Sequence, residues 1–417
     1  MKLTRVLFSI FIFCFGALAS TTPPAQARLL FIGQGKGSGL GWEVGLLKAL
    51  EQKVPAFDRG QIIFAADSGP SVLGAFFACK GFSASSLAEA ETLLKRFDPK
   101  LVNDNPAAKL ITAFKKIGLA HLFGRTLSWA ELETSLVTLG PESMNDVLDW
   151  ITENGTCVPR LPLLIATANQ DILDNRNQKI DVDEKQLDYD NDSVYDADEK
   201  YLGKACTYFA TPDVMEALAR VPWQERLCDL RPIRNAQDLR LAVLASVSEP
   251  TYLPRVAEPH PELIVSDGIH PVTSRWYNGG FVIPGAVQDL RRLFPSLPTI
   301  GSGRPEYSSM EKAVVRGLYA VHLEPALQHA KWWLDVIIQP SPDEWTWIAR
   351  PHKDYPASVE RLVDDGEKAA EACLEVQSCV PAPSTVQVSK LDYAIGGSPD
   401  QPVKTGRGRA IWSELTK

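Results

Sequence analysis

The sequence has few of the residues that build metal and redox centres. Its 417 residues include six histidines, four methionines and seven cysteines. No two cysteines have Cys-x-x-Cys spacing, and no histidine stands at the spacing of a zinc ligand pair from a cysteine. We therefore expect neither a zinc site nor a thiol-redox centre.

An excess of positive charge is also lacking. The formal net charge of −8 argues against nucleic acid, or an anionic membrane surface, as a partner held by general electrostatics. Much of the acidity lies in residues 181–199, so the rest of the chain is close to balanced. Hydrophobic and charged fractions of 45% and 23% are ordinary for a globular protein.

Long apolar runs are absent apart from one near the start. Lys2 and Arg5 precede an apolar run from Val6 to Ala19, which is too short and wrongly flanked for a transmembrane helix. We interpret residues 1–27 as a secretory signal peptide that ends at Ala25-Gln26-Ala27, and expect an exported protein, periplasmic or secreted. An uncleaved membrane anchor is the alternative.

Six cysteines lie outside this segment, an even number that predicts disulfides in an oxidising compartment. Cys373 and Cys379 are close enough in sequence to close a small loop. The other four allow three pairings that the sequence does not rank: Cys79, Cys157, Cys206 and Cys228.

Short apolar runs alternate with amphipathic stretches near the start of the mature chain. Strand-like Leu29–Ile32 and Ile62–Ala65 are each followed by a helical pattern, at about 41–52 and at Val72–Ala78. This rhythm is typical of a parallel sheet with helices on both faces, so we expect an α/β fold.

Later segments extend this pattern. Leu163–Ala168 and Leu239–Leu244 look like strands, and residues 358–374 look like a helix. Residues 381–417 are rich in Pro, Ser, Gly and Gln, which predicts an extended tail. We expect one domain over residues 28–380.

A glycine cluster, Gly33-Gln34-Gly35-Lys36-Gly37-Ser38-Gly39, lies between the first predicted strand and helix. Glycines there let backbone N–H groups turn toward an anion, helped by the helix N-terminus. The cluster lacks the Gly-x-Gly-x-x-Gly spacing of a dinucleotide-binding loop, and Gly37 follows Lys36 where a Walker loop needs Ser or Thr. A turn without a ligand is the alternative.

The segment Ala66-Asp67-Ser68-Gly69-Pro70 joins the second predicted strand to a helix. It is an imperfect Gly-x-Ser-x-Gly, the sequence of a nucleophile elbow, in which a serine stands on a tight strand-to-helix turn. Proline is tolerated in a first helical turn. Taken alone, a serine here is more often a helix cap.

The order of glycine-rich turn, helix, strand and Ser68 resembles the opening of patatin-like phospholipases. Leu244–Pro254 is similar to the family's Ala-Ser-x-x-x-Pro-x-x-x-Pro stretch, and Ile300-Gly301-Ser302-Gly303 resembles its next glycine-rich strand end. Tyr277-Asn278-Gly279-Gly280 stands where the family has Asp-Gly-Gly. The resemblance covers about residues 29–375.

The resemblance implies a three-layer α/β/α fold and a serine acyl hydrolase that acts on lipid esters, of phospholipase A or esterase type, without a catalytic cofactor. Ser68 would be the nucleophile of a serine–aspartate dyad, and membrane contact would be transient. Backbone N–H groups of the glycine-rich turn would form the oxyanion hole, at Gly35, Lys36, Gly37, Ser38 and Gly39.

One departure from the family concerns the base. Asn278 occupies the position of the dyad aspartate, and an amide can orient the serine hydroxyl but cannot take its proton. Losing a general base lowers a rate by ~10²–10⁴. Asp267 could replace it, although an Asp-Gly surface turn is the simpler interpretation. Asp67 is expected to point away from Ser68.

Two further alternatives remain at this stage, a pseudo-hydrolase and an exported calcium-stabilised interaction module in which Ser68 is buried or merely a helix cap. A pseudo-hydrolase would keep the pocket and bind a lipid or a partner without turnover. The histidines offer no replacement base, since none precedes Ser68 and the α/β-hydrolase order is not evident. The sequence does not indicate an oligomeric state.

An acidic insertion at about 171–202 contains a calcium-loop pattern over Asp188–Glu199. Carboxylates fall at loop positions 1, 3, 5, 9 and 12, with a backbone carbonyl at position 7, as oxygen coordination of Ca²⁺ requires. Ser193 replaces the usual glycine, and a solvated acidic loop is the alternative. A bound calcium would be structural, held by Asp188, Asp190, Asp192, Val194, Asp196 and Glu199.

Overall fold

The computed structural model describes part of the chain. The described residues are 27–35, 37–97, 115, 122–123, 141–169, 206–222, 226, 228–248, 253, 256–257, 259–260, 263, 275–278, 283–304, 334–348 and 354–376. Residues 1–26 of the predicted signal peptide, the acidic insertion and the predicted tail lie outside them.

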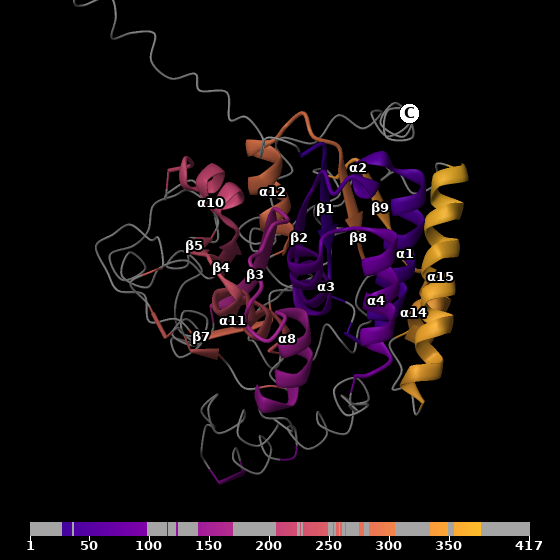
Figure 1. Ribbon diagram of the computed structural model, residues 1–417, viewed down its shortest axis with the longest axis horizontal. Helices are drawn as coiled ribbons and strands as arrows, with labels where there is room; N and C mark the ends of the chain where they lie inside the picture. Colours follow the sequence, from indigo (N-terminus) through magenta and orange to yellow (C-terminus); the bar gives the residue numbers. More distant parts are fainter. Residues whose placement is uncertain are drawn as a thin grey trace, which may run out of the picture.

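A mostly parallel sheet forms the centre of the molecule (Figure 1). Its main path runs β5-β4-β3-β2-β1-β8-β9, and β7 joins β3 and β6 off this path. Among the described strands, pairing is antiparallel only between β3 and β4, β3 and β7, and β6 and β7. The strands are β1 (Leu29–Gly33), β2 (Ile62–Ala66), β3 (Leu163–Asn169), β4 (Cys206–Ala210), β5 (Asp229–Pro232), β6 (Val256–Ala257), β7 (Arg275–Asn278), β8 (Thr299–Ser302) and β9 (Val336–Ile338).

Helices cover both faces of the sheet. On one face α1, α3, α4, α8, α11 and α15 pack against one another; α10 and α12 pack together beside β2, β4 and β5. The predicted three-layer α/β/α class is therefore confirmed. The helical segments are η1 (Gly37–Gly39), α1 (Leu40–Lys53), α2 (Pro55–Asp58), α3 (Ser68–Lys80), α4 (Ala84–Leu94), η2 (Pro141–Met144), α8 (Asn145–Ile151), α10 (Pro212–Ala219), α11 (Ala236–Val247), α12 (Ile283–Leu293), α14 (Pro342–Ile348) and α15 (Tyr355–Val376).

Along β1 and β2, successive side chains are buried on opposite faces of the sheet. Phe31 and Phe64 belong to the main hydrophobic cluster, their ring centroids 4.9 Å apart. Their neighbours Ile32, Ile63 and Ala65 are equally buried but lie outside that cluster. Because successive side chains of a strand point to opposite faces, these strands are apolar throughout, as strands buried on both faces must be.

The predicted strands at 29–32, 62–65 and 163–168 and the predicted helices at 41–52, 72–78 and 358–374 are confirmed. The prediction of a strand at Leu239–Leu244 is wrong, because this run lies in α11. The side chain of Asn235 caps that helix by accepting a hydrogen bond from Asp238 N (3.0 Å). Leu239, Ala242, Val243 and Ser246 are buried at helical spacing, a pattern that a short apolar run conceals.

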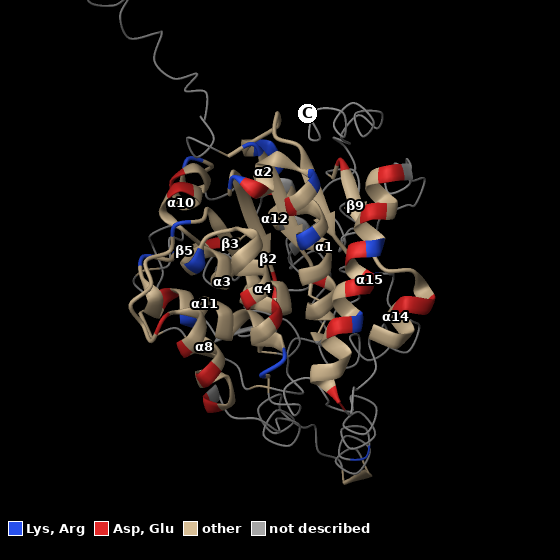
Figure 2. Cartoon of the chain, turned by 45° about the vertical axis from the view of Figure 1, so that its right-hand side comes forward, with Lys and Arg blue, Asp and Glu red and all other residues tan. Residues whose placement is uncertain are grey.

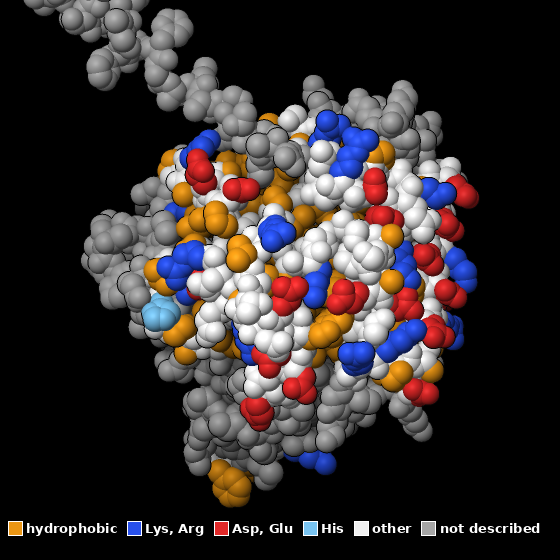
Figure 3. Space-filling model, in the orientation of Figure 1, with side chains coloured by type: hydrophobic (Ala, Val, Ile, Leu, Met, Phe, Trp, Pro, Cys, Tyr) orange, Lys and Arg blue, Asp and Glu red, His pale blue; other side chains and the backbone are white. Residues whose placement is uncertain are grey.

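Helices α1 and α15 lie side by side at one end of the sheet (Figure 1). Glycines bring their backbones together: a Cβ atom on Gly45 would lie 1.9 Å from Val363 O, and one on Gly366 2.0 Å from Trp42 O. Acidic and basic residues lie along α15 (Figure 2). Charges of both signs are also interspersed over the face of the molecule shown in Figure 3.

Two disulfides confirm the prediction from the cysteine count. Cys79, in the last turn of α3, pairs with Cys157 after α8, and Cys206 at the start of β4 pairs with Cys228 before β5. Cys373 is also disulfide-bonded. Within the described part of the chain, no helix has both the length and the apolar character needed to cross a bilayer.

Candidate functional site

The turn between β2 and α3 has the backbone of a nucleophile elbow. Ser68 is the first residue of α3 and has φ of 51°, while Asp67 before it is extended (φ −133°, ψ 161°). A positive φ is uncommon outside glycine and costs about 1–3 kcal/mol, so it persists only where the surroundings enforce it. Ser68 is not the helix cap, since Asp67 holds that position without a side-chain capping bond.

The glycine-rich turn contacts this elbow directly. A Cβ atom on Gly35 would lie 2.6 Å from Ser68 Cβ and 3.1 Å from Ser68 Oγ. A Cβ atom on Gly33 would lie 2.7 Å from Pro70 Cβ. Glycine is therefore required at both positions for the end of β1 to approach the start of α3 so closely.

Asn278 pairs with the same edge of β3 as β2 does, just beyond the point where the pairing with β2 ends. Thr167 of β3 pairs with Thr207 of β4 on one side and with Asn278 of β7 on the other. The second side is the one that pairs with β2, whose last residue, Ala66, lies opposite Ile165. Ile165 and Thr167 are two residues apart, ~7 Å along a strand. The backbones of the elbow and of residue 278 are thus brought together.

A buried hydroxyl occupies the junction between β2 and β7. Ser246 of α11 is fully buried, accepts a hydrogen bond from Ser68 N (2.9 Å) and donates one to Ala166 O (2.8 Å). Ala166 is the residue between the last β3 pair with β2 and the first with β7. Sequence reasoning placed Ser246 in a family motif but gave it no role.

One donor of the predicted oxyanion hole is hydrogen-bonded to a carboxylate of the protein itself. Gly35 N donates to both carboxylate oxygens of Asp67, each at 3.2 Å. The sequence predicts an Asp67 side chain that points away from Ser68; its carboxylate instead reaches the same glycine that Ser68 contacts. Gly37 and Gly39 form η1, while Lys36 and the side chain of Ser38 lie outside the described residues.

A second buried carboxylate lies against the glycine-rich turn. Glu43, in the first turn of α1, is fully buried and accepts a hydrogen bond from Ser302 Oγ at the end of β8. Its Oε1 lies 3.1 Å from the position of a Gly33 Cβ. Gln34 Oε1 accepts from Arg304 N (3.2 Å). No sequence motif singles out Glu43; only its burial in the fold identifies it.

Other predicted site residues fall outside the described residues. These are Asp267 and the calcium-loop positions between Asp188 and Glu199. Among the residues that are described, no group of three or more His, Cys, Asp or Glu side chains is arranged to hold a metal ion. Both proposals therefore stay predictions from the sequence.

A buried polar cluster lies on the α12 face of β4. Tyr208 OH donates to Asp289 Oδ2 at 3.3 Å, and burial together with the charge of Asp289 raises the Tyr208 pKa well above its usual value. Burial likewise lowers the pKa of the Arg226 guanidinium, against the opposing charges of Asp229 and Asp289. The cluster belongs to the packing of this face.

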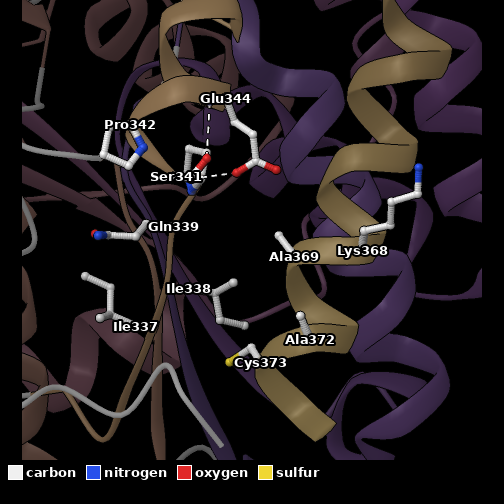
Figure 4. Close-up of a pocket in the computed structure, with 11 residues that line it drawn as sticks. Ile337, Ile338, Gln339, Ser341, Pro342, Glu344, Lys368, Ala369, Ala372 and Cys373 are labelled. Atoms are coloured by element: carbon white, nitrogen blue, oxygen red, sulfur yellow. Dashed lines mark hydrogen bonds between the residues drawn. The ribbon is translucent and has the colours of Figure 1, made fainter. Parts of the chain in front are cut away.

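A cavity of about 600 Å³ lies between the end of β9, the start of α14 and α15 (Figure 4). Ile338, Ala369 and Ala372 are among its apolar lining residues. Ser341 N donates to Glu344 Oε2 (2.6 Å) and Glu344 N to Ser341 Oγ (3.2 Å), so these polar groups cap α14. Neither Ser68 nor the glycine-rich turn lines this cavity.

Comparison with known protein families finds no family model that matches the chain, and comparison with curated proteins finds no match. The likeness to patatin-like phospholipases therefore stays a prediction from the residues quoted above. What the geometry adds is the arrangement around Ser68.

Proposed function

We propose that the protein is a patatin-like serine acyl hydrolase that acts on lipid esters, with Ser68 as the nucleophile. One observation carries the proposal: Ser68 has a positive φ on a strand-to-helix turn, beside a glycine-rich turn and next to the strand that bears Asn278. A strained serine in that setting is typical of a nucleophile displayed to substrate.

In this reaction Ser68 Oγ forms a bond to the acyl carbon, and the alcohol leaves with a proton. Water then releases the carboxylic acid and restores the hydroxyl. Asn278 can orient the hydroxyl but cannot accept its proton, so turnover is reduced unless another carboxylate supplies the base. Asp267 stays a candidate for that role.

A second candidate function is a non-catalytic lipid- or partner-binding protein on the same scaffold. The bond from Gly35 N to the Asp67 carboxylate favours it, because an anion of the protein already uses one donor of the predicted oxyanion hole. This candidate and the hydrolase differ in whether Ser68 reacts.

Export to the periplasm or beyond is part of the proposal, supported by the disulfides and by the pattern at residues 1–27. A structural calcium in the acidic insertion is a further part. Added calcium should raise the melting temperature of the wild type but not that of a variant with Asp188→Ala and Glu199→Ala; an unchanged wild type contradicts the site.

The decisive experiment treats purified mature protein with a fluorophosphonate probe and with short and long acyl esters. We expect labelling of the wild type and none of Ser68→Ala, with Ser248→Ala as a matched buried-serine control. Asn278→Asp should raise ester turnover. Equal labelling of wild type and Ser68→Ala would exclude Ser68 as the nucleophile, and unlabelled wild type together with unlabelled Asn278→Asp would favour the binding protein.

A further inference from the structure

We infer that Ser246 is a positioning residue, whose hydroxyl sets the separation between Ser68 and residue 278. The inference rests on the proposed function, because it assigns Ser246 to the site in which Ser68 reacts. Its basis is a hydrogen-bonded link from the elbow to β3, at the place where the pairing of β3 with β7 starts.

Two backbone groups, Ser68 N and Ala166 O, meet the Ser246 hydroxyl where β2 turns into α3. The N–H of a first helical residue has no acceptor inside its helix, so Ser68 N needs one from elsewhere. Ala166 lies in the gap between the β2 and β7 pairings along one edge of β3. The Ser246 hydroxyl accepts from Ser68 N and donates to Ala166 O, and so satisfies both groups.

This link determines how the elbow sits relative to β7. Ala166 directly precedes Thr167, which pairs with Asn278. A hydroxyl that holds Ser68 N to Ala166 O therefore holds the start of α3 at a fixed place along the edge that carries residue 278. Without it, the elbow loses this hydrogen-bonded link to β3.

Helix α11 is well placed to keep this hydroxyl fixed. It packs against α3, β3 and β7, the three elements that meet at the junction. The Asn235 cap and the buried ion pair between Arg231 and Asp238 (3.0 Å) anchor its first turn. Ser246 itself is fully buried, so bulk water does not compete for the hydrogen bonds of its hydroxyl.

The link also has a chemical consequence. Because Ser68 N already donates to Ser246, this N–H is not a donor for an oxyanion. The contribution of Ser246 is therefore to hold the positive-φ backbone and the direction of Ser68 Oγ. A misplacement of about 1 Å at a reacting group can lower a rate by ~10²-fold.

The test compares Ser246→Ala with Ser246→Thr, which keeps the hydroxyl, and with Ser248→Ala. Ser248 is also buried near the end of α11, but its hydroxyl donates to Leu244 O (2.7 Å) and does not touch the elbow. Saturating fluorophosphonate kinetics should show a limiting labelling rate ~10- to 100-fold lower in Ser246→Ala, with an unchanged half-saturation concentration. Ser246→Thr should restore the rate, and Ser248→Ala should lose melting temperature without losing rate.

A double variant tests the link to residue 278. The gain from Asn278→Asp should shrink at least several-fold in the Ser246→Ala background, because residues in one network are not additive. An undiminished gain, or equal labelling rates in Ser246→Ala and Ser248→Ala, would overturn the inference and leave the proposed function standing.

If the probe labels no variant, amide hydrogen exchange distinguishes the positioning role of Ser246 from the proposed hydrolase activity. Ser68 N–H should exchange at least tenfold faster in Ser246→Ala than in Ser248→Ala, relative to each variant's global stability. Absent labelling with this difference would refute the hydrolase and retain the positioning role of Ser246 at the elbow. Absent labelling with equal exchange would refute both.

Discussion

The carboxylate of Asp67 faces the backbone N–H of Gly35, with both oxygens 3.2 Å from the nitrogen. Asp67 is fully buried, and the position of a Gly35 Cβ would lie 2.8 Å from its Oδ2. An acidic side chain therefore lies against the turn that the resemblance assigns to stabilising negative charge. If Ser68 is the nucleophile, as proposed, this contact disfavours an oxyanion at the glycine-rich turn.

Replacing Asp67 with asparagine should increase the reactivity of Ser68. The change keeps an oxygen that can accept from Gly35 N but removes a carboxylate that disfavours negative charge nearby. Because Gly35 N stays bonded and only the negative charge is removed, we expect a gain below the ~10²–10³ that a whole oxyanion donor is worth in kcat, roughly tenfold in fluorophosphonate labelling. The exposed carboxylate variant Asp58→Asn serves as control. A loss of labelling in a folded Asp67→Asn would mean that the carboxylate assists the reaction.

Replacing Gly45 with alanine should destabilise the protein strongly. The new Cβ would lie 1.9 Å from Val363 O, so α1 and α15 would have to separate along their whole contact. Overpacking of this kind typically costs about 1–3 kcal/mol, and backbone atoms cannot move aside as a side chain can. Urea unfolding measures the change, with the exposed Gln52→Ala in the same helix as control. Equal stability of the two variants would show that α1 and α15 pack less closely than these distances indicate.

The sequence predicts more of the fold than of the candidate site. The apolar runs at 29–32 and 62–65 identify β1 and β2, because a strand that is buried on both faces is apolar at nearly every position. The run at 239–244 misleads, since five apolar residues out of six suit a strand and a buried helix face equally. For Ser68 the motif gives the residue, but the partners of its backbone come from pairing over long sequence distances. Ser246 lies 178 residues away, and sequence alone gives no register for such contacts.

Acid should remove the contribution of Asp238 to stability. Burial alone would raise the pKa of this carboxyl, but hydrogen bonds from Arg234 and the charge of Arg231 outweigh it and lower the pKa below 3.8. A lowered folded-state pKa means that the stabilisation is complete above the unfolded-state pKa and is lost as the pH falls through the folded-state value.

The measurement is urea unfolding of wild type and Asp238→Asn between pH 7 and pH 2.5. We expect wild type to be the more stable protein at pH 7, and the difference to shrink as the pH falls below about 4. Asp58→Asn, at an exposed site, should show little difference at either pH. A gap that stays constant across this range would contradict the role of the two arginines.

Removing the disulfide between Cys79 and Cys157 should cost more stability than removing that between Cys206 and Cys228. The first closes a loop of 78 residues and the second one of 22, and a longer loop restrains the unfolded chain more. We expect losses of about 2–5 kcal/mol, measured by chemical unfolding of the paired Cys→Ala variants. The reverse order would indicate that strain or packing around the bonds outweighs chain entropy.

The central place of β1 has a consequence for the order of events during synthesis. This strand comes first among the described elements, yet it lies between β2 and β8, and its pairing partner Thr299 is made some 270 residues after Leu30. A nascent chain can therefore complete only one edge of β1 before the ribosome has reached the last third of the sequence. Until then an apolar strand edge stays open to wrong partners, which makes slow, late folding and dependence on a holding chaperone the expected behaviour of this topology.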